Sequence, residues 1–259
     1  MMNEVQIIDT NMDNILEYGV CGYKSIKREG FPQKVAWLKE RFAEGLKLKT
    51  LHSNADGTQG MIEYLPGEYC WRPVEASGYM FIHCIFSGFK KIYKNKGYGS
   101  LLLDECLQDA QKENTYGVAV VTRKGSFMAD NNLFLKHGFE VTDTAPSDFE
   151  LLVKKMRKDT PTPKFKTNWD ERRNKYDKGL TIIRADQCPY TVKNVNEISE
   201  CAQNEYGLKP NIINLASYKE AQESPCAFGT FCILYDGKVI AEHPISKGRF
   251  ANIMKKIGG

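Results

Sequence analysis

The segment Lys94-Asn95-Lys96-Gly97-Tyr98-Gly99-Ser100 carries the strongest structural signal in this 259-residue chain. It lies between a strand predicted over Tyr79–Phe86 and a helix predicted over Gly97–Gln111. Glycines let backbone N–H groups approach a ligand closely, and the positive end of the following helix dipole favours an anion. Lys94 and Lys96 add positive charge. The segment therefore predicts a phosphate or pyrophosphate cradle, with a glycine turn that only starts a helix as the alternative.

The residues on both sides of this cradle predict a first domain with a mixed sheet. Alternating apolar residues indicate strands, and apolar residues at helical spacing indicate helices. Strand, glycine turn, helix and strand form a βαβ unit, which predicts an α/β (α+β) fold class. The further expected strands are Val5–Asp9, Leu46–His52, Gly60–Leu65, Val118–Thr122 and Phe149–Lys154, and the further expected helices are Gln33–Glu44 and Asp130–Lys136.

Two domains are expected, because the chain exceeds the usual length of about 100 to 200 residues for one. Apolar periodicity stops after residue 156 and resumes at Leu180. We therefore predict domains over residues 1–156 and 179–259, joined by a basic, proline-containing linker over residues 157–178. In the second domain we expect a helix over Thr191–Glu205, a hairpin turn at Asp236–Gly237 and the strands Leu180–Ala185, Ile212–Leu215, Thr230–Tyr235 and Lys238–Ala241.

Composition and charge exclude several classes of function. The longest apolar stretches, such as Tyr79–Phe86, are far shorter than the roughly 20 residues that span a bilayer, so no membrane partner is expected. The net charge is +4 without an arginine-rich stripe, so no nucleic-acid partner is expected. The N-terminus lacks a secretory-signal pattern, which predicts a cytoplasmic protein. The eight cysteines include no CxxC pair, so no metal site is expected.

The cradle segment resembles the acetyl-CoA motif of the GNAT acetyltransferases, in which an Arg or Gln is followed by two residues, Gly, one residue, and Gly or Ala. Lys94 takes the first position. The block Asn131–Phe139 resembles the helix and strand that follow the cofactor cleft in this family. The resemblance covers residues 1–155 and implies the GNAT acyl-CoA N-acyltransferase fold, a splayed mixed sheet flanked by helices. It implies an acetyl-CoA-dependent N-acetyltransferase that acts on an amine of a small molecule, or of a peptide or protein.

The resemblance also implies which residues bind acetyl-CoA. Backbone groups at the end of the strand would contact the pantetheine arm and the acetyl carbonyl, and the cradle would hold the pyrophosphate. The connection from Ser87 to Lys94 is longer than is usual in the family, which leaves the register of these contacts open by a residue or two. The implied cofactor-binding residues are Ile85, Phe86, Ser87, Lys94, Asn95, Lys96, Gly97, Tyr98, Gly99, Ser100 and Asn132.

The resemblance implies that the amine attacks the thioester directly, so the protein must remove a proton and assist thiolate departure. Many relatives have a tyrosine as general acid where this chain has Phe134, which cannot donate a proton. Tyr98, Tyr64 and Tyr69 are the candidates for that role. The alternative is that CoA leaves as a thiolate and is protonated by water.

Two carboxylates that precede the cofactor strand are the candidates for the general base. Glu63 and Glu68 lie in a segment with several aromatic residues, and a solvated or arginine-paired carboxylate is the alternative for both. His83 is expected to be a buried structural histidine. Trp71 and Arg72 are expected to line the acceptor site, where the planar guanidinium would bind a carboxylate, with an ordinary surface ion pair as the alternative for Arg72.

The second domain begins with a strand that leads to Cys188 at the expected start of a helix. A helix N-terminus stabilises a thiolate and makes the thiol more reactive. This placement is thioredoxin-like, but Thr191 stands where a dithiol motif has its second cysteine. A reactive monothiol, a ligand-binding role and a purely structural role remain open for Cys188. Pro225 is expected to be cis, which would bring Cys226 towards Cys188.

A family resemblance supports this interpretation of the C-terminal part. The resemblance is to the YoaP-like domain attached to some bacterial acetyltransferases, and it implies an association with acyl transfer rather than a chemistry of its own. It covers residues 179–257 and rests on Gln187–Tyr190, Ser224–Pro225, Tyr235–Gly237 and Ser246–Phe250.

Acyl transfer is the leading hypothesis, with acetyl-CoA and an unidentified amine acceptor as partners. One alternative is a thiol-redox or CoA-binding sensor centred on Cys188, with little transferase activity. Another is a CoA-binding module without catalysis, motivated by Phe134 in the usual acid position. The sequence leaves monomer and homodimer both open.

Overall fold

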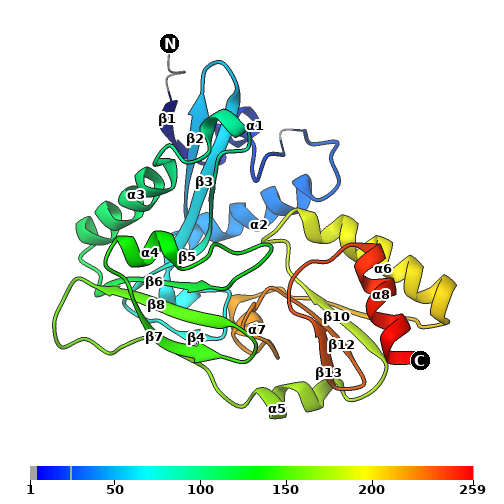
Figure 1. Cartoon of the computed structure of the whole chain (residues 1–259). Coiled ribbons are helices and arrows are strands. Elements are labelled where there is room, and N and C mark those ends of the chain that lie inside the picture. Colours follow the sequence, from blue (N-terminus) through cyan, green and yellow to red (C-terminus); the bar gives the residue numbers. More distant parts are fainter. Residues whose placement is uncertain (1–4, 24, 259) are drawn as a thin grey trace. The chain divides into compact units, whose positions relative to one another are not determined.

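The computed structural model describes residues 5–23 and 25–258. The chain forms two compact units (Figure 1). The first contains Met1–Cys70 and Val74–Phe165, and the second contains Trp71–Pro73 and Lys166–Gly259. Residues 157–178, predicted as a linker, are thus divided between the two units, and this segment contains a short strand and two short helices.

A seven-stranded mixed sheet is the centre of the first unit (Figure 1). Its order is β1-β2-β3-β5-β6-β8-β7. β5 and β6 are parallel, and the other neighbouring strands are antiparallel. The predicted fold class, a mixed sheet flanked by helices, is confirmed. The strands are β1 (Val5–Thr10), β2 (Lys47–Ser53), β3 (Gly57–Pro66), β5 (Met80–Ser87), β6 (Gly117–Thr122), β7 (Glu140–Ala145) and β8 (Phe149–Lys155).

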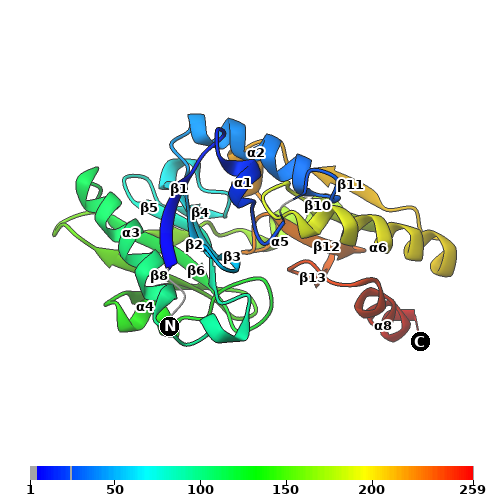
Figure 2. The ribbon, with the colours of Figure 1, turned by 90° about the horizontal axis from the view of Figure 1, so that it is seen from above.

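Two long helices cover opposite faces of this sheet (Figure 2). α3 (Tyr98–Lys112) packs on a core that includes Tyr64 of β3. α2 (Phe31–Ala43) packs on the other face, because its Lys34 pairs with Glu63, and adjacent residues of a strand point to opposite faces. The shorter elements of this unit are α1 (Ile15–Tyr18), η1 (Gly67–Tyr69), β4 (Val74–Glu75), η2 (Lys91–Tyr93), α4 (Asn132–Lys136) and β9 (Lys164–Phe165).

Local sequence signals explain where these elements begin and end. Pro32 lies in the first turn of α2, where its missing N–H has no helical partner to lose. Gly45 follows the end of α2 with a φ of +88°, a left-handed conformation that glycine adopts without steric cost. β7 was not predicted, because most of its residues are exposed and its apolar Val141 points to solvent.

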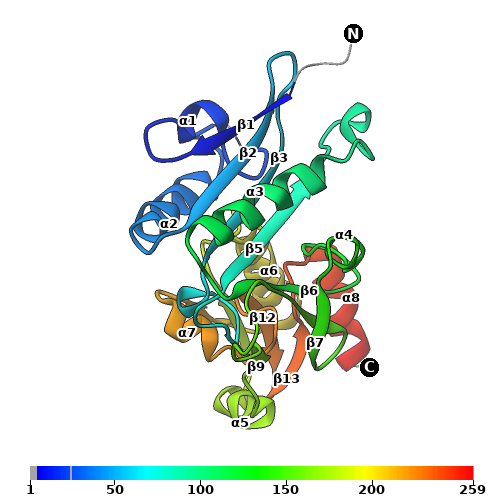
Figure 3. The ribbon, with the colours of Figure 1, turned by 90° about the vertical axis from the view of Figure 1, so that its left-hand side faces the viewer.

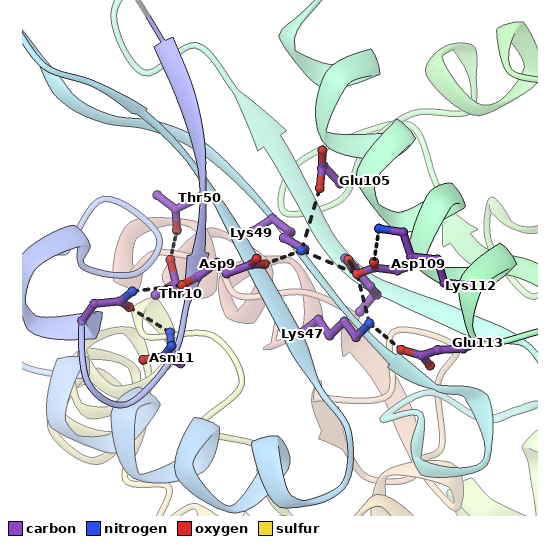
Figure 4. A network of polar contacts seen from close by, with 12 residues as sticks. Asp9, Thr10, Asn11, Lys47, Lys49, Thr50, Glu105, Asp109, Lys112 and Glu113 are labelled. Atoms are coloured by element: carbon purple, nitrogen blue, oxygen red, sulfur yellow. Dashed lines mark hydrogen bonds and ion pairs between the residues drawn. The ribbon is translucent and has the colours of Figure 1, made fainter.

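A polar network joins α3 to β2 and β3 within the core (Figure 4). The buried Tyr64 hydroxyl donates a hydrogen bond of 2.7 Å to Asp109 Oδ2. Lys47 Nζ lies 3.0 Å and Lys49 Nζ 3.6 Å from the same oxygen. Burial alone would raise the pKa of Asp109, but the hydrogen bonds from Tyr64 and Lys47 and the charges of both lysines bring it below its ordinary value. The network therefore stabilises the ionised carboxylate.

A four-stranded sheet of order β11-β10-β12-β13 is the centre of the second unit. β10 and β11 are parallel and are connected through α6, whereas β12 and β13 form an antiparallel hairpin. None of the helices that the structure describes combines the length and apolar character needed to cross a bilayer. The elements are α5 (Trp169–Arg173), η3 (Asn174–Tyr176), β10 (Leu180–Arg184), α6 (Tyr190–Tyr206), β11 (Asn211–Asn214), α7 (Tyr218–Gln222), β12 (Phe231–Tyr235), β13 (Lys238–Ala241) and α8 (Lys247–Gly258).

Two turn predictions for the second unit have different outcomes. The hairpin turn at Asp236–Gly237 is confirmed, and both residues have the positive φ of a type I′ turn, +46° and +76°. The cis bond expected at Pro225 is wrong, since no peptide bond among the described residues is cis. The loop before β12 is held instead by Arg172, which donates to the carbonyl oxygens of Gln222 at 3.0 Å and Ser224 at 3.3 Å.

We predict that Asp109→Asn lowers the free energy of unfolding at neutral pH by about 2 kcal/mol, the contribution typical of a hydrogen bond to a charged group. Because the folded-state pKa of Asp109 is lowered, its contribution is present above the ordinary carboxyl pKa and is lost as the pH falls through the folded-state value. Urea denaturation at neutral and at acidic pH would measure the difference between wild type and variant.

Asp104→Asn is the matched control for this experiment, since Asp104 lies on the same helix with its side chain 49% exposed. We expect this variant to unfold like the wild type. Two results would contradict the stabilising role of ionised Asp109. One is equal destabilisation by the two substitutions, and the other is a loss of unfolding free energy in Asp109→Asn that is as large at acidic pH as at neutral pH.

Candidate functional site

Strand β5 separates from its parallel neighbour halfway along its length (Figure 3). Met80–Ile82 pair with Val118–Val120 of β6, yet β5 continues to Ser87. Beyond Ile82, the backbone groups on that edge of β5 have no pairing with β6. An extended ligand can hydrogen-bond to such an edge as an added strand would.

A β-bulge marks the place where the separation begins. Along the β3–β5 ladder, Glu63 is opposite Cys84 but Tyr64 is opposite Ile82, so His83 is an extra residue on β5. A bulge bends the strand and leaves the extra residue outside the regular ladder. The bend therefore turns the end of β5 away from β6.

The N-terminus of α3 faces this opening. Gly97 caps the helix with a φ of +81°, and Asn95 before it is also left-handed, with a φ of +58°. The hydrogen bond from Leu101 N to Gly97 O, at 3.1 Å, closes the first turn of the helix, and no side chain of the described residues caps it. The N–H groups of the first turn have no acceptor within a helix, so this end suits an anion.

Gly99 brings three segments of the chain together. A Cβ at this position would lie 3.6 Å from Ser87 Oγ at the end of β5 and 3.5 Å from Leu133 Cδ2 of α4. A Cβ added to Gly97 would have no other atom within 4 Å. The end of β5, the start of α3 and the residue after Asn132, all predicted to contribute to the cofactor site, thus lie close together.

The side chains of these residues divide between core and solvent. Ile85 is part of the buried core, so only its backbone is available to a ligand. Phe86 is half-buried, and its ring centroid lies 4.6 Å from that of Phe89. Exposed side chains belong to Lys94, Asn95, Lys96 and Asn132, whereas Ser87, Tyr98 and Ser100 are half-buried.

Three residues of the β2–β3 hairpin, Ser53, Asp56 and Gln59, hold the β5–α3 connection, and the sequence did not predict this role for them. The backbone carbonyl oxygen of Gln59 accepts a hydrogen bond from Gly88 N at 2.7 Å, and its side-chain Oε1 accepts one from Lys90 N at 3.2 Å. The buried Tyr93 hydroxyl contacts Ser53 Oγ and Asp56 Oδ2, each at 2.7 Å. The long connection is therefore a folded turn fixed to the β2–β3 hairpin. Partners more than 30 positions apart leave no local sequence signal.

The two candidate bases lie in very different surroundings. Glu63 is completely buried, forms an ion pair with the equally buried Lys34, and has Oε1 3.7 Å from His83 Nδ1. It is shielded from solvent, and its ion-pair partner on α2 is a lysine. Glu68 is exposed in η1 and accepts from Gly78 N at 3.5 Å. The structure does not bring these two carboxylates together.

Of the candidate acids, Tyr98 is the one at the cradle. It is the first residue of α3, is half-buried, and its ring centroid lies 6.1 Å from that of Tyr93. Burial raises the pKa of Tyr64, and its hydroxyl is engaged by Asp109 on the core side of the sheet. Tyr69 belongs to η1, away from the cradle in the fold. Phe134 is fully buried, which leaves the usual acid position apolar.

Trp71 and Arg72, predicted to bind the acceptor, belong to the second unit. Both are buried, and the Arg72 guanidinium lies 4.6 Å from the centre of the Phe228 ring. A Cβ on Gly229 would lie 2.4 Å from Trp71 O, so a larger residue cannot fit there without moving the backbone. These contacts indicate a packing role within that unit.

Cys188 is half-buried just before α6, as the sequence predicted. The Thr191 hydroxyl donates to the carbonyl oxygens of Cys188 at 2.8 Å and Ala185 at 3.2 Å. Threonine thus fixes the turn that a second cysteine would occupy in a dithiol motif. Cys226 is buried and donates to Phe231 O at 3.3 Å.

Several solved structures are similar to part of the chain. An acetyltransferase of the GNAT family from Staphylococcus aureus Mu50 is 15% identical, with a TM-score of 0.43, 60% of this chain covered and 100% of the other. A GNAT family acetyltransferase from Elizabethkingia anophelis, solved with acetyl-CoA bound, is 17% identical, with a TM-score of 0.38 and the same coverage of 60% and 100%.

Sequence comparisons reach the whole chain. Residues 211–252 match the YoaP-like family. The uncharacterized N-acetyltransferase YoaP of Bacillus subtilis (strain 168) is 30% identical over 254 residues, which cover 96% of this chain and 98% of that protein. The chain therefore belongs to the family of the N-acetyltransferase YoaP, as the GNAT and YoaP-like resemblances predicted.

Proposed function

We propose that the protein transfers an acetyl group from acetyl-CoA directly to an amine of a small molecule, or of a peptide or protein. The observation that carries this proposal is the opening between β5 and β6, with the uncapped N-terminus of α3 facing it across Gly99. The relationship to an N-acetyltransferase over almost the whole chain supports the same activity.

The residues of this opening fit acetyl-CoA. The unpaired edge of β5 up to Ser87 suits the amide groups of an extended pantetheine arm. The N–H groups at the start of α3 suit the pyrophosphate, and the exposed Lys94 and Lys96 add favourable charge. Gly97 leaves open space where a side chain would stand, so the phosphate groups can approach the backbone closely.

The chain's own groups would perform three tasks during transfer. Acetyl-CoA supplies an acyl group activated as a thioester. The backbone around the bulge of β5 would orient and polarise its carbonyl, since a bulge frees donors from the ladder. Tyr98, at the start of α3, is our candidate for protonating the departing thiolate. Because thiols have a pKa near 8.5, water is a competent alternative proton source.

The second candidate function is a thiol-redox or CoA-binding sensor centred on Cys188. It is favoured by a half-buried thiol placed between a strand and the start of α6 in a βαβ unit. Thr191 in place of a second cysteine limits it to chemistry of one thiol. The test below separates it from acyl transfer.

We predict that Gly99→Leu weakens acetyl-CoA binding by about 100-fold or more, because its side chain would fill the space between Ser87 and Leu133. Isothermal titration calorimetry would measure the dissociation constant. Gly248→Leu is the matched control, since this glycine lies in α8 with no atom near its added Cβ. Unchanged binding in Gly99→Leu, or no acetyl-CoA binding by the wild type, would refute the cofactor site.

We predict that Cys188→Ser keeps the rate of thiol release from acetyl-CoA, with an amine present, within about twofold of wild type, as expected for a side chain outside the acyl-transfer site. The measurement is a spectrophotometric thiol-release assay over a panel of primary amines. Loss of all activity in this variant, with acetyl-CoA binding intact, would instead favour the sensor centred on Cys188.

A further inference from the structure

A buried charged cluster lies between α2 and the sheet, on the face opposite α3. Lys34 of α2 pairs with Glu63 of β3, and both side chains are 0% exposed. The Lys34 ammonium also lies 4.2 Å from the centre of the Trp37 ring. Such a pair holds its geometry tightly, because separating the two charges would leave one of them buried and uncompensated.

His83 connects this cluster to the acyl-transfer site. It is the bulged residue at which β5 turns away from β6, so its position along the strand is where the opening begins. Its Nδ1 lies 3.7 Å from Glu63 Oε1, and its ring centroid lies 5.7 Å from that of Phe81. The His83 side chain is only 2% exposed, whereas the next residue, Cys84, is half-buried. A substrate amine would therefore have to reach the imidazole from the side of the strand that opens beyond Ile82.

We propose that His83 is the general base that accepts the proton of the attacking amine, and that Glu63, held by Lys34, is its positioning residue. The proposal rests on the proposed acetyl transfer. The buried position expected for His83 is confirmed, and the proposal adds a catalytic role to it. The proposal also gives Glu63 a supporting role in place of the base role predicted from the sequence. Histidine suits this task because its charge changes near neutral pH.

The proton and bond changes balance. The nitrogen lone pair of the amine forms the bond to the acetyl carbon, the carbon–sulfur bond breaks, and its electron pair leaves with the CoA thiolate. The proton lost from nitrogen passes to the imidazole of His83. The thiolate takes up one proton and the imidazolium returns one to solvent, so amine and acetyl-CoA become amide and free CoA.

The charged groups near His83 come from two neighbouring elements. Glu63 faces it from β3 with a carboxylate, Lys34 on α2 is directed to the other carboxylate oxygen, and Cys84 follows it on β5. The carboxylate next to Nδ1 is the group that stabilises the positive charge of the imidazolium.

The decisive variant is His83→Gln, with His243→Gln as the matched control. His243 belongs to the second unit, where its Nδ1 lies 2.8 Å from Pro244 O. With phenethylamine as probe, we expect His83→Gln to lower kcat by about 100-fold or more, while calorimetry gives an unchanged dissociation constant for acetyl-CoA. His243→Gln should match the wild type in both measurements.

The pH profile and chemical rescue separate catalysis from packing. The acidic limb of the kcat/KM profile should be lost in His83→Gln, and added imidazole should restore activity to His83→Ala. An arylamine, which is already neutral at pH 7, should lose less activity than phenethylamine. Thermal melting of each variant would show whether the fold is retained.

Three outcomes would overturn the proposal. One is a His83→Gln variant that keeps both kcat and the acidic limb. Another is that His83→Gln loses activity only to the extent that its melting temperature falls, while added imidazole restores no activity to His83→Ala. A wild-type protein that binds acetyl-CoA but acetylates no probe would refute the proposed function and this inference together, whereas failure of His83→Gln alone leaves the proposed function standing.

Discussion

The early separation of β5 from β6 is the constraint on which the first unit depends. Two parallel strands that pair for only three residues cannot close the sheet beyond Ile82. The separated end of β5 has folded elements near it. The start of α3 packs close to it at Gly99, and the turn around Tyr93 is fixed to the β2–β3 hairpin. The proposed acetyl-CoA site therefore depends on the sheet itself, with folded elements on each side.

Strand β3 contributes a buried polar or charged side chain to a network on each face of the sheet. Tyr64 points to α3 and joins Asp109, whereas the preceding Glu63 points to α2 and joins Lys34. Because strand residues alternate, consecutive positions can serve two unrelated networks. The Asp109 network fixes α3 to the sheet, and the Glu63 pair fixes the histidine at the bulge, so one strand holds both the cofactor helix and the proposed base in register.

The sequence predicted those features whose residues are contiguous. The glycine turn that begins α3 at Gly97 and the hairpin turn at Asp236–Gly237 are short patterns with a direct backbone consequence. The supports of the site could not be predicted, since Gln59 and Lys34 act on partners about 30 positions away, and a bulge at His83 has no sequence pattern. The same reason explains why Glu63 could be chosen as a base without its buried partner being foreseen.

The tight approach of Gly229 to Trp71 has a consequence for biosynthesis. Trp71 is synthesised early, but Gly229, which packs against its backbone carbonyl, follows more than 150 positions later in the chain. At roughly 5–20 residues per second, a ribosome needs on the order of ten seconds to reach it. The packing of these two backbone segments therefore forms only after almost the whole chain has been synthesised.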